Sequence, residues 1–186
     1  MKPNGNARQA LVCWFTGLSG AGKSSVAEGV LRQLADKRVQ ALILDGDVVR
    51  EKMHCDLDFS PSGIVENNRR IAEYCAAIRD QYDVILVPII SPYRASRQHA
   101  REILKPRFFE IHCAANLGTV SQRDVKGLYE KARKGEMTNL IGYSPESPYE
   151  PPLSPDLTLD TGSESPEQSI RKLACFIEDN LTHHYA

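Results

Sequence analysis

The stretch LVCWFTGLSGAGKSS, residues 11–25, decides the fold that we expect for this chain. Its apolar half, residues 11–16, predicts a buried β-strand, and a helical pattern begins near Ser25. Between them lies a glycine-rich turn with the spacing G-x-x-x-x-G-K-[ST], at Gly17, Gly22, Lys23 and Ser24. A strand, this turn and a helix in that order are typical of a phosphate-binding loop.

The chemistry of phosphate binding explains why these residue types occur at this spacing. Glycines let backbone N–H groups face phosphate oxygens, and the N-terminus of the following helix adds partial positive charge. Lys23 is expected to neutralise the β- and γ-phosphates, and the Ser24 hydroxyl to hold Mg2+. The sequence therefore predicts ATP and Mg2+ as cofactors, with the ATP-binding set Gly17, Leu18, Ser19, Gly20, Ala21, Gly22, Lys23, Ser24 and Ser25. A glycine-rich turn without a ligand is the alternative.

Length and composition indicate one domain over residues 1–186. The formal net charge of −1 gives no reason to expect a general affinity for nucleic acid. No apolar run approaches the roughly 20 residues that span a membrane, and the polar residues 1–9 predict a flexible tail and a cytoplasmic protein. The five cysteines form no C-x-x-C pair and are expected to be reduced and mostly buried; zinc binding is the other interpretation.

Strands and helices alternate along the rest of the chain, which predicts an α/β fold with a parallel sheet and helices on both faces. Further strands are expected at residues 41–44, 83–90, 108–113 and 157–159. Helices are expected at residues 25–36, 48–53, 60–81, 95–104, 114–122 and 165–181. Within 60–81, a solvated charged face is one interpretation of Glu66, Asn67, Arg69 and Arg70.

Two aspartates, Asp45 and Asp47, follow the strand predicted at 41–44. They are expected at the carboxyl edge of the sheet, where open α/β sheets bind ligands. Asp47 is equally suited to cap the next helix, and both interpretations are compatible. The strand predicted at 83–90 leads into Ser91 and Pro92 instead of the aspartate common in P-loop proteins. This pattern suits a small-molecule kinase better than a GTPase.

Residues 123–156 are predicted to form a lid and a binding loop. Residues 123–134 are basic and amphipathic, and residues 142–156 contain five prolines, which exclude a regular helix or a central strand. A connection of this length and composition is typical of a functional loop.

Seven segments, GLSGAGKSS, LDGDVVR, DLDFS, ENNRRIAE, ISPYRASR, RDVKGLYEKARKGE and SPYEPP, resemble the adenylylsulfate kinase family in their order and spacing. The similarity runs from about residue 11 to residue 181. It implies a P-loop NTPase fold with a lid, usually as a homodimer. It also implies transfer of the γ-phosphoryl group of ATP, with Mg2+, to the ribose 3′-hydroxyl of adenylylsulfate, giving 3′-phosphoadenylylsulfate. The expected partner is a small nucleotide, with neither nucleic acid nor membrane.

The resemblance also implies roles for single residues. The catalytic set is Lys23, Asp45, Asp47 and Ser91, in which an aspartate orients or deprotonates the attacking hydroxyl. Arg123 joins the ATP-binding set. The acceptor-binding set is Asp47, Arg50, Phe59, Asn67, Ile90, Ser91 and Lys126, with Phe59 stacking on the base. Ser91 matches a serine described in the family as a phosphoserine intermediate, and a hydrogen bond to the acceptor is the alternative role. Arg133 either neutralises phosphate from the lid or belongs to a solvated basic helix.

Besides Val48, which stands where the family has an asparagine, four positions depart from the family pattern, and all four concern the acceptor. Gly63 and Ile64 stand where the family has an aspartate and an arginine, and Thr138 and Leu140 where it has a lysine and a base-stacking phenylalanine. These departures leave two other functions open. One is a related kinase acting on another nucleotide, such as cytidine diphosphoramidate. The other is a non-catalytic nucleotide-binding module, against which the intact Lys23 argues.

Overall fold

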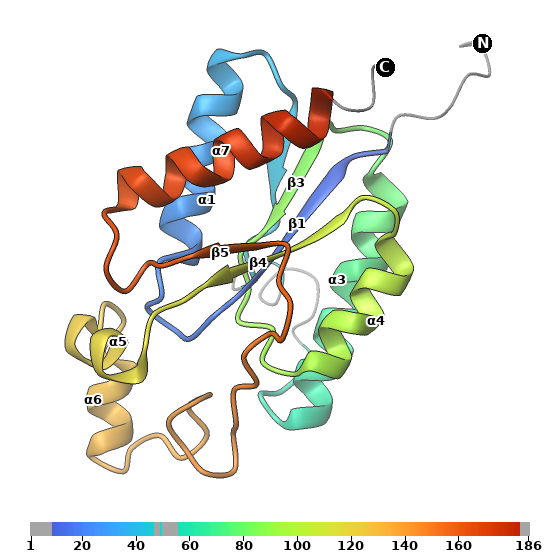
Figure 1. Cartoon of the computed structure of the whole chain (residues 1–186). Coiled ribbons are helices and arrows are strands. Elements are labelled where there is room, and N and C mark those ends of the chain that lie inside the picture. Colours follow the sequence, from blue (N-terminus) through green and yellow to red (C-terminus); the bar gives the residue numbers. More distant parts are fainter. Residues whose placement is uncertain (1–8, 47–48, 50–55, 183–186) are drawn as a thin grey trace.

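The computed structural model describes residues 9–46, 49 and 56–182, and its centre is a five-stranded parallel sheet (Figure 1). The strands are β1 (Leu11–Thr16), β2 (Ala41–Ile43), β3 (Val84–Val87), β4 (Phe108–Cys113) and β5 (Leu157–Leu159). Their order across the sheet is β2-β3-β1-β4-β5. Because β1 lies in the middle, its carboxyl end delivers the glycine-rich turn to the centre of the sheet edge.

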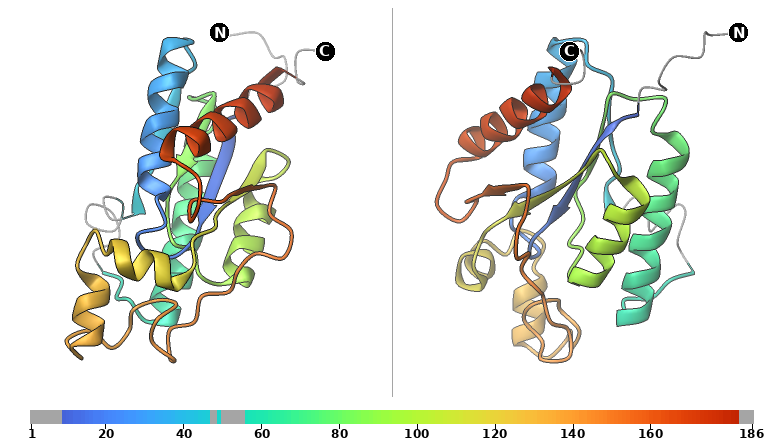
Figure 2. Two further views of the ribbon diagram at one scale, coloured as in Figure 1. Left: turned by 60° about the vertical axis from the view of Figure 1, so that its left-hand side comes forward. Right: turned by 45° about the vertical axis from the view of Figure 1, so that its right-hand side comes forward.

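Helices cover both faces of the sheet (Figures 1 and 2). On one face, α1 (Lys23–Asp36) packs against α7 (Pro166–Thr182). On the other face, α3 (Pro61–Ile78) packs against α4 (Arg94–Leu104). The short helices α5 (Leu117–Arg123) and α6 (Leu128–Arg133) lie beyond the carboxyl end of β4. This layered arrangement confirms the predicted α/β fold class.

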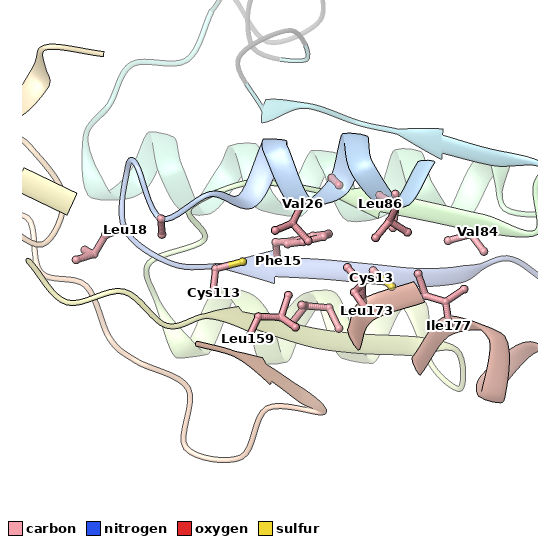
Figure 3. Close-up of a cluster of buried hydrophobic side chains, with 14 of the residues drawn as sticks. Cys13, Phe15, Leu18, Val26, Val84, Leu86, Cys113, Leu159, Leu173 and Ile177 are labelled. Carbon is pink, nitrogen blue, oxygen red and sulfur yellow. The ribbon is translucent and has the colours of Figure 1, made fainter. Parts of the chain in front are cut away.

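The two faces of the sheet carry two separate apolar cores. Alternate side chains of β1 enter each core, because successive residues of a strand point to opposite faces. Leu11, Cys13 and Phe15 face α1 and α7, and Figure 3 shows this core together with Leu173 and Ile177 of α7. Val12 and Trp14 enter the core on the α3 and α4 side. Burial on both faces explains why the sequence of β1 is an unbroken apolar run.

Most of the predicted boundaries agree with the structure. The strands β1, β4 and β5 have the predicted bounds, whereas β3 ends at Val87, before the predicted residue 90. Pro88 has no backbone N–H and cannot continue the ladder of hydrogen bonds. The helix predicted over 60–81 ends at Ile78. Residues 1–8 and nearly all of the helix predicted near 48–53 lie outside the described residues.

The chain between β4 and β5 is mostly irregular. Asp124, with a left-handed φ of 30°, ends α5, and α6 takes up only part of the basic stretch 123–134. Residues 142–156 contain neither helix nor strand, as the prolines predict.

The cysteines of the described residues are not paired with one another. Cys13, Cys75 and Cys113 are buried free thiols, and Cys175 is exposed. Within the described ranges, no three His, Cys, Asp or Glu side chains converge as a metal site. None of the helices in this part of the chain is long and apolar enough to cross a membrane.

Candidate active site

The glycine-rich turn after β1 has a conformation that requires glycine. The φ angles of Gly17, Gly20 and Gly22 are 149°, 74° and 87°. A Cβ atom on Gly17 would lie 2.7 Å from the carbonyl oxygen of Cys113, so a larger residue would push β4 away from the turn. Gly22 precedes the first residue of α1, Lys23. The first backbone N–H groups of a helix have no partner within the helix and are suited to bind phosphate.

Lys23 and Ser24 place polar groups beside this turn. Lys23 is only 7% exposed, and its Nζ donates hydrogen bonds to the carbonyl oxygens of Gly17 (2.8 Å) and Leu18 (2.7 Å). The Ser24 hydroxyl donates to Oδ2 of Asp45, 3.2 Å away, just after β2. A cation, a hydroxyl and a carboxylate therefore meet at the start of α1.

A cavity of about 320 Å³ opens at this edge of the sheet, a size typical of small-molecule sites. One half of its wall is the glycine-rich turn and the start of α1, with Ser19, Gly20, Gly22, Lys23, Ser24, Ser25 and Asp45. The other half comes from three segments. Phe59 lies just before α3, Ile64, Asn67 and Asn68 lie in its N-terminal part, and Ile90 and Ser91 follow β3. Val125, Lys126 and Ile141 of the predicted lid add to the wall. The cavity thus joins the glycine-rich turn, which we call the phosphate half, to a second group of residues, which we call the acceptor half.

Ser91 is the most firmly held residue of the acceptor half. It is 2% exposed and has a left-handed φ of 43°, a conformation that costs a residue other than glycine about 1–3 kcal/mol. Its Oγ accepts hydrogen bonds from Nε1 of Trp14 (2.9 Å) and Nδ2 of Asn68 (3.0 Å). Its carbonyl oxygen accepts from Oγ1 of Thr16 (3.1 Å) and Nη1 of Arg97 (2.7 Å). These four contacts explain how the strained turn persists.

Arg97 connects Ser91 to residues 142–156, which we call the proline-rich loop. Its side chain is nearly fully buried; Nε donates to the carboxylate of Glu110, and Nη2 donates to the carbonyl oxygen of Glu150, 2.7 Å away. The hydroxyl of Tyr149 lies 3.0 Å from Oγ1 of Thr16, at the end of β1. The proline-rich loop is therefore anchored to the sheet edge beside the cavity.

A second anchor joins the predicted lid to the phosphate turn. Tyr129 of α6 is 1% exposed, and its hydroxyl donates to the carbonyl oxygen of Ser19, 2.9 Å away. Burial, together with the Asp124 carboxylate, raises the pKa of Tyr129 to about 12, so the phenol keeps the proton that it donates. Asp124 in turn accepts hydrogen bonds from the backbone N–H groups of Tyr129 (3.0 Å) and Glu130 (2.9 Å).

Most of the predicted site residues line the cavity, including Ser24, Phe59, Asn67, Ile90, Ser91 and Lys126. Leu18 and Ala21 instead pack into the core beneath the turn, and the Gly17 carbonyl faces Lys23. Arg123, predicted to bind ATP, is absent from the cavity wall and donates a hydrogen bond to the carbonyl oxygen of Thr161, 2.8 Å away. Asp47 and Arg50 lie outside the described residues.

The motifs do not single out Asn68 or Trp14, which both contact Ser91. Helical spacing carries the signal for Asn68, since it follows Ile64 by four residues and precedes Ile71 by three on the buried face of α3. The same spacing corrects the interpretation of Asn67 as part of a charged surface: it is 5% exposed and lines the cavity. The charged residues beside it do form a partly exposed surface network of ion pairs, Glu66 with Arg69 and Arg70.

The four departures from the family pattern fall in different surroundings. A Cβ atom on Gly63 would lie 2.4 Å from Oδ1 of Asp58 and 2.5 Å from its carbonyl oxygen, so this turn leaves no room for an aspartate. Ile64 is 6% exposed and presents an apolar surface to the cavity. Thr138 is exposed and Leu140 is buried in the core, and neither lines the cavity.

The glycine-rich turn lies between the central strand and a helix, and it opens into one cavity with an aromatic and polar acceptor half. These features together define a P-loop kinase. Comparison with known proteins narrows this class. The family model for adenylylsulphate kinase matches residues 9–160. The chain belongs to the adenylylsulphate kinase family.

Individual relatives agree with this assignment. An adenylyl-sulfate kinase of Halothermothrix orenii is 46% identical over 173 residues, which cover 92% of this chain and 91% of the relative. That of Acaryochloris marina is 41% identical over 175 residues, covering 94% and 84%. The structure of the Mycobacterium tuberculosis APS kinase CysC in complex with AMPPNP and APS matches with a TM-score of 0.86 and 40% identity, covering 91% of this chain and 98% of that chain.

Proposed function

We propose that this chain transfers the γ-phosphoryl group of ATP to the 3′-hydroxyl of adenylylsulfate, giving 3′-phosphoadenylylsulfate. The observation that carries this proposal is the single cavity in which the phosphate turn faces the acceptor half. Two reactants held in one cavity react as if in a unimolecular step, which is the main source of catalysis in phosphoryl transfer. The names and coverage of the relatives supply the acceptor.

The phosphate half is suited to hold the triphosphate. Backbone N–H groups of the turn and of the first turn of α1 would bind phosphate oxygens. In this structure the Lys23 ammonium group is satisfied by two carbonyl oxygens of the turn, and it is close enough to exchange them for phosphate oxygens. Its charge would then offset the charge that develops on the transferred group.

Ser24 and Asp45 are the residues that would hold Mg2+. A hydroxyl and a carboxylate 3.2 Å apart offer the oxygen ligands that Mg2+ prefers, and phosphate oxygens and water complete such sites. When bound, the metal would neutralise charge on the phosphates. Asp45 is then best placed as a metal-side residue, which leaves Asp47 to orient or deprotonate the attacking hydroxyl. Asp47→Asn is expected to lower kcat far more than the affinity for ATP, and an effect on the KM for ATP alone would reject this role.

The acceptor half offers contacts for a nucleoside. Phe59 is 59% exposed and lines the cavity, so its ring is accessible for a base to stack on. Asn67 and Ser91 provide polar groups, and Lys126 brings a cation from the lid to the same wall.

The apolar Ile64 favours a second candidate, a kinase for another nucleotide such as cytidine diphosphoramidate. Ile64 cannot pair with the sulfate or phosphate of an anionic acceptor, and the close approach of Asp58 leaves no room for a side chain at Gly63. An acceptor that places an uncharged group against Ile64 loses nothing there, whereas an anion loses a contact worth roughly 1.5–3 kcal/mol.

The test is an acceptor panel with the purified protein, ATP and Mg2+. ADP release is measured with adenylylsulfate, with cytidine diphosphoramidate and without acceptor, and the product is identified by mass spectrometry and NMR. Acceptor-dependent ADP release with 3′-phosphoadenylylsulfate as product supports the proposal. Turnover of only the cytidine nucleotide supports the second candidate. ADP release at the same rate with and without an acceptor rejects both. The homodimer and the cytoplasmic location remain predictions from the sequence.

A further inference from the structure

The hydroxyl of Ser91 is surrounded by hydrogen-bond donors. The indole N–H of Trp14 can only donate, so the Ser91 oxygen must accept at 2.9 Å. The amide nitrogen of Asn68 donates to the same oxygen at 3.0 Å. A serine oxygen has two lone pairs. Both are therefore occupied, and the hydroxyl has only its own proton left to offer.

That proton is not donated to any residue that the structure describes. Because Ser91 lines the acceptor half of the cavity and donates no hydrogen bond within residues 9–46, 49 and 56–182, its proton is available to a molecule bound there. The backbone cannot turn to relieve this arrangement, because Thr16 and Arg97 hold the Ser91 carbonyl oxygen. Trp14 is 0% exposed and Asn68 is 3% exposed, so water cannot replace either donor.

We propose that Trp14 and Asn68 are positioning residues. By donating to the Ser91 oxygen, they leave its hydroxyl able only to donate a hydrogen bond to the acceptor molecule, and unable to accept one from it. The inference rests on the proposed function, since it assumes that an acceptor occupies this half of the cavity. The atom that Ser91 contacts must be a hydrogen-bond acceptor, which in a nucleotide is a ribose, sulfate or phosphate oxygen or an unprotonated ring nitrogen. A molecule that presents an N–H group there would leave two donors facing each other and would bind poorly.

The same arrangement argues against attack by Ser91 on phosphorus. A nucleophilic serine needs an adjacent base to take its proton, which frees the electron pair that forms the new bond. Among the described residues, the two groups that contact the Ser91 oxygen, the Trp14 indole and the Asn68 amide, are donors that cannot take a proton.

The decisive variant is Asn68→Asp, which keeps the shape of the side chain and changes its hydrogen bonding. An ionised carboxylate only accepts, so the Ser91 proton would turn toward it and away from the acceptor molecule. Burial raises the pKa of a carboxyl group, and the protonated form can again donate to Ser91. We therefore expect kcat/KM of Asn68→Asp to fall about tenfold below that of Asn68→Leu at pH 8, and to recover as the pH is lowered. The wild type and Asn68→Leu should lack this acid recovery.

Other charges near this site must be taken into account in that pH profile. Those that share the cavity or contact Ser91 are Lys23, Asp45, Lys126 and Arg97. On α3 itself, Glu66, Arg69 and Arg70 form ion pairs with one another. All are present in the wild type and in Asn68→Leu as well, so the difference between the profiles isolates position 68.

Tryptophan fluorescence provides a readout that does not require turnover. Trp14 is the only tryptophan of the chain, and its N–H contacts the Ser91 oxygen. In Asn68→Asp, the Trp14 emission should change with pH at the same midpoint as kcat/KM, while the emission of Asn68→Leu should not. If adenylylsulfate is not a substrate, the profile is measured with whichever nucleotide is turned over. If no nucleotide is turned over, the pH dependence of the Trp14 emission alone tests whether position 68 controls the hydrogen bonding of Ser91. Failure of the proposed function and failure of this inference are thereby distinguished.

A double-mutant cycle separates the hydroxyl from the charge. In a Ser91→Ala background there is no proton to redirect, so adding Asn68→Asp should cost less than about twofold. If the full loss persists in that background, the negative charge itself repels the acceptor and the inference is overturned. A pH-independent Asn68→Asp that matches Asn68→Leu overturns it as well. Circular dichroism checks that each variant is folded. Trp14→Phe provides a second test, because it removes the indole donor: we expect a higher KM for the acceptor and little change in the KM for ATP.

Discussion

Replacing the buried Arg97 by methionine tests how the site is held together. Methionine keeps an unbranched apolar stem of similar length but removes the charge and all three hydrogen bonds, to Glu110, Ser91 and Glu150. Glu110 would keep little access to water, since its side chain is 12% exposed and its other cation, Arg101, lies 3.9 Å away. Breaking a buried ion pair from one side typically costs 3–5 kcal/mol. We expect Arg97→Met to lower the free energy of unfolding by about that amount.

Urea denaturation, followed by circular dichroism, measures this loss. Two matched variants identify its source. Arg97→Lys keeps the charge but loses the planar fork, and should fall between the wild type and Arg97→Met. Arg97→Met combined with Glu110→Gln removes the uncompensated charge, and should recover more than about 1 kcal/mol. Because Arg97 also holds the Ser91 carbonyl oxygen, kcat should fall in the folded fraction of Arg97→Met.

The reasoning is refuted if Arg97→Met costs less than about 1 kcal/mol, since no buried pair would then have been broken. It is also refuted if the double variant is no more stable than Arg97→Met. In that case the loss would come from packing rather than from the charge left on Glu110.

Three further predictions concern the phosphate half, the acceptor half and the surface of α3. Lys23→Ala should nearly abolish transfer while the protein stays folded, and near wild-type kcat would contradict its assignment. Ile64→Arg should lower the KM for adenylylsulfate about tenfold or more in a kinetic assay, and an unchanged KM would show that no anionic group reaches this wall. Hydrogen bonds from Arg69 and Arg70 lower the pKa of Glu66 from 4.5 to about 2, so its contribution to stability is complete above pH 4.5 and is lost as the pH falls toward 2. Melting temperatures of Glu66→Gln should therefore depend less on pH over this window than those of the wild type, and parallel curves would contradict the assignment.

The central strand and the phosphate turn could be predicted from sequence because their signals are local. The apolar run of β1 and the spacing of Gly17, Gly22 and Lys23 each depend on neighbouring residues only, and the structure has them where the pattern predicts. Pro88 carried a local signal as well, and giving it more weight would have ended the strand predicted at 83–90 at Val87.

The contacts around Ser91 could not be predicted in the same way. Trp14 is 77 residues from Ser91 in sequence, and the Glu150 carbonyl oxygen is 53 residues from Arg97. In the sequence, Arg97 is one of several charged residues of a surface-like helix, and only the packing of α4 against the proline-rich loop makes it a buried donor. The charged neighbours of Asn67 suggest a surface position, whereas its spacing from Ile64 and Ile71 places it on the buried face of α3.

The anchoring of the proline-rich loop limits what can move when the site closes. Tyr149 is fixed to Thr16, the backbone N–H of Arg94 donates to the Glu150 carboxylate at 2.7 Å, and Asp156 accepts from Arg101. The chain before this segment, which carries Lys126 and Ile141, is tied instead to the glycine-rich turn, through the hydrogen bond from the Tyr129 hydroxyl to the carbonyl oxygen of Ser19. Residence time and selectivity are therefore expected to depend on different parts of the chain. Substitutions between residues 128 and 146, which leave Lys126 in place, should change how long a nucleotide stays bound without changing which nucleotide the Ser91 wall accepts.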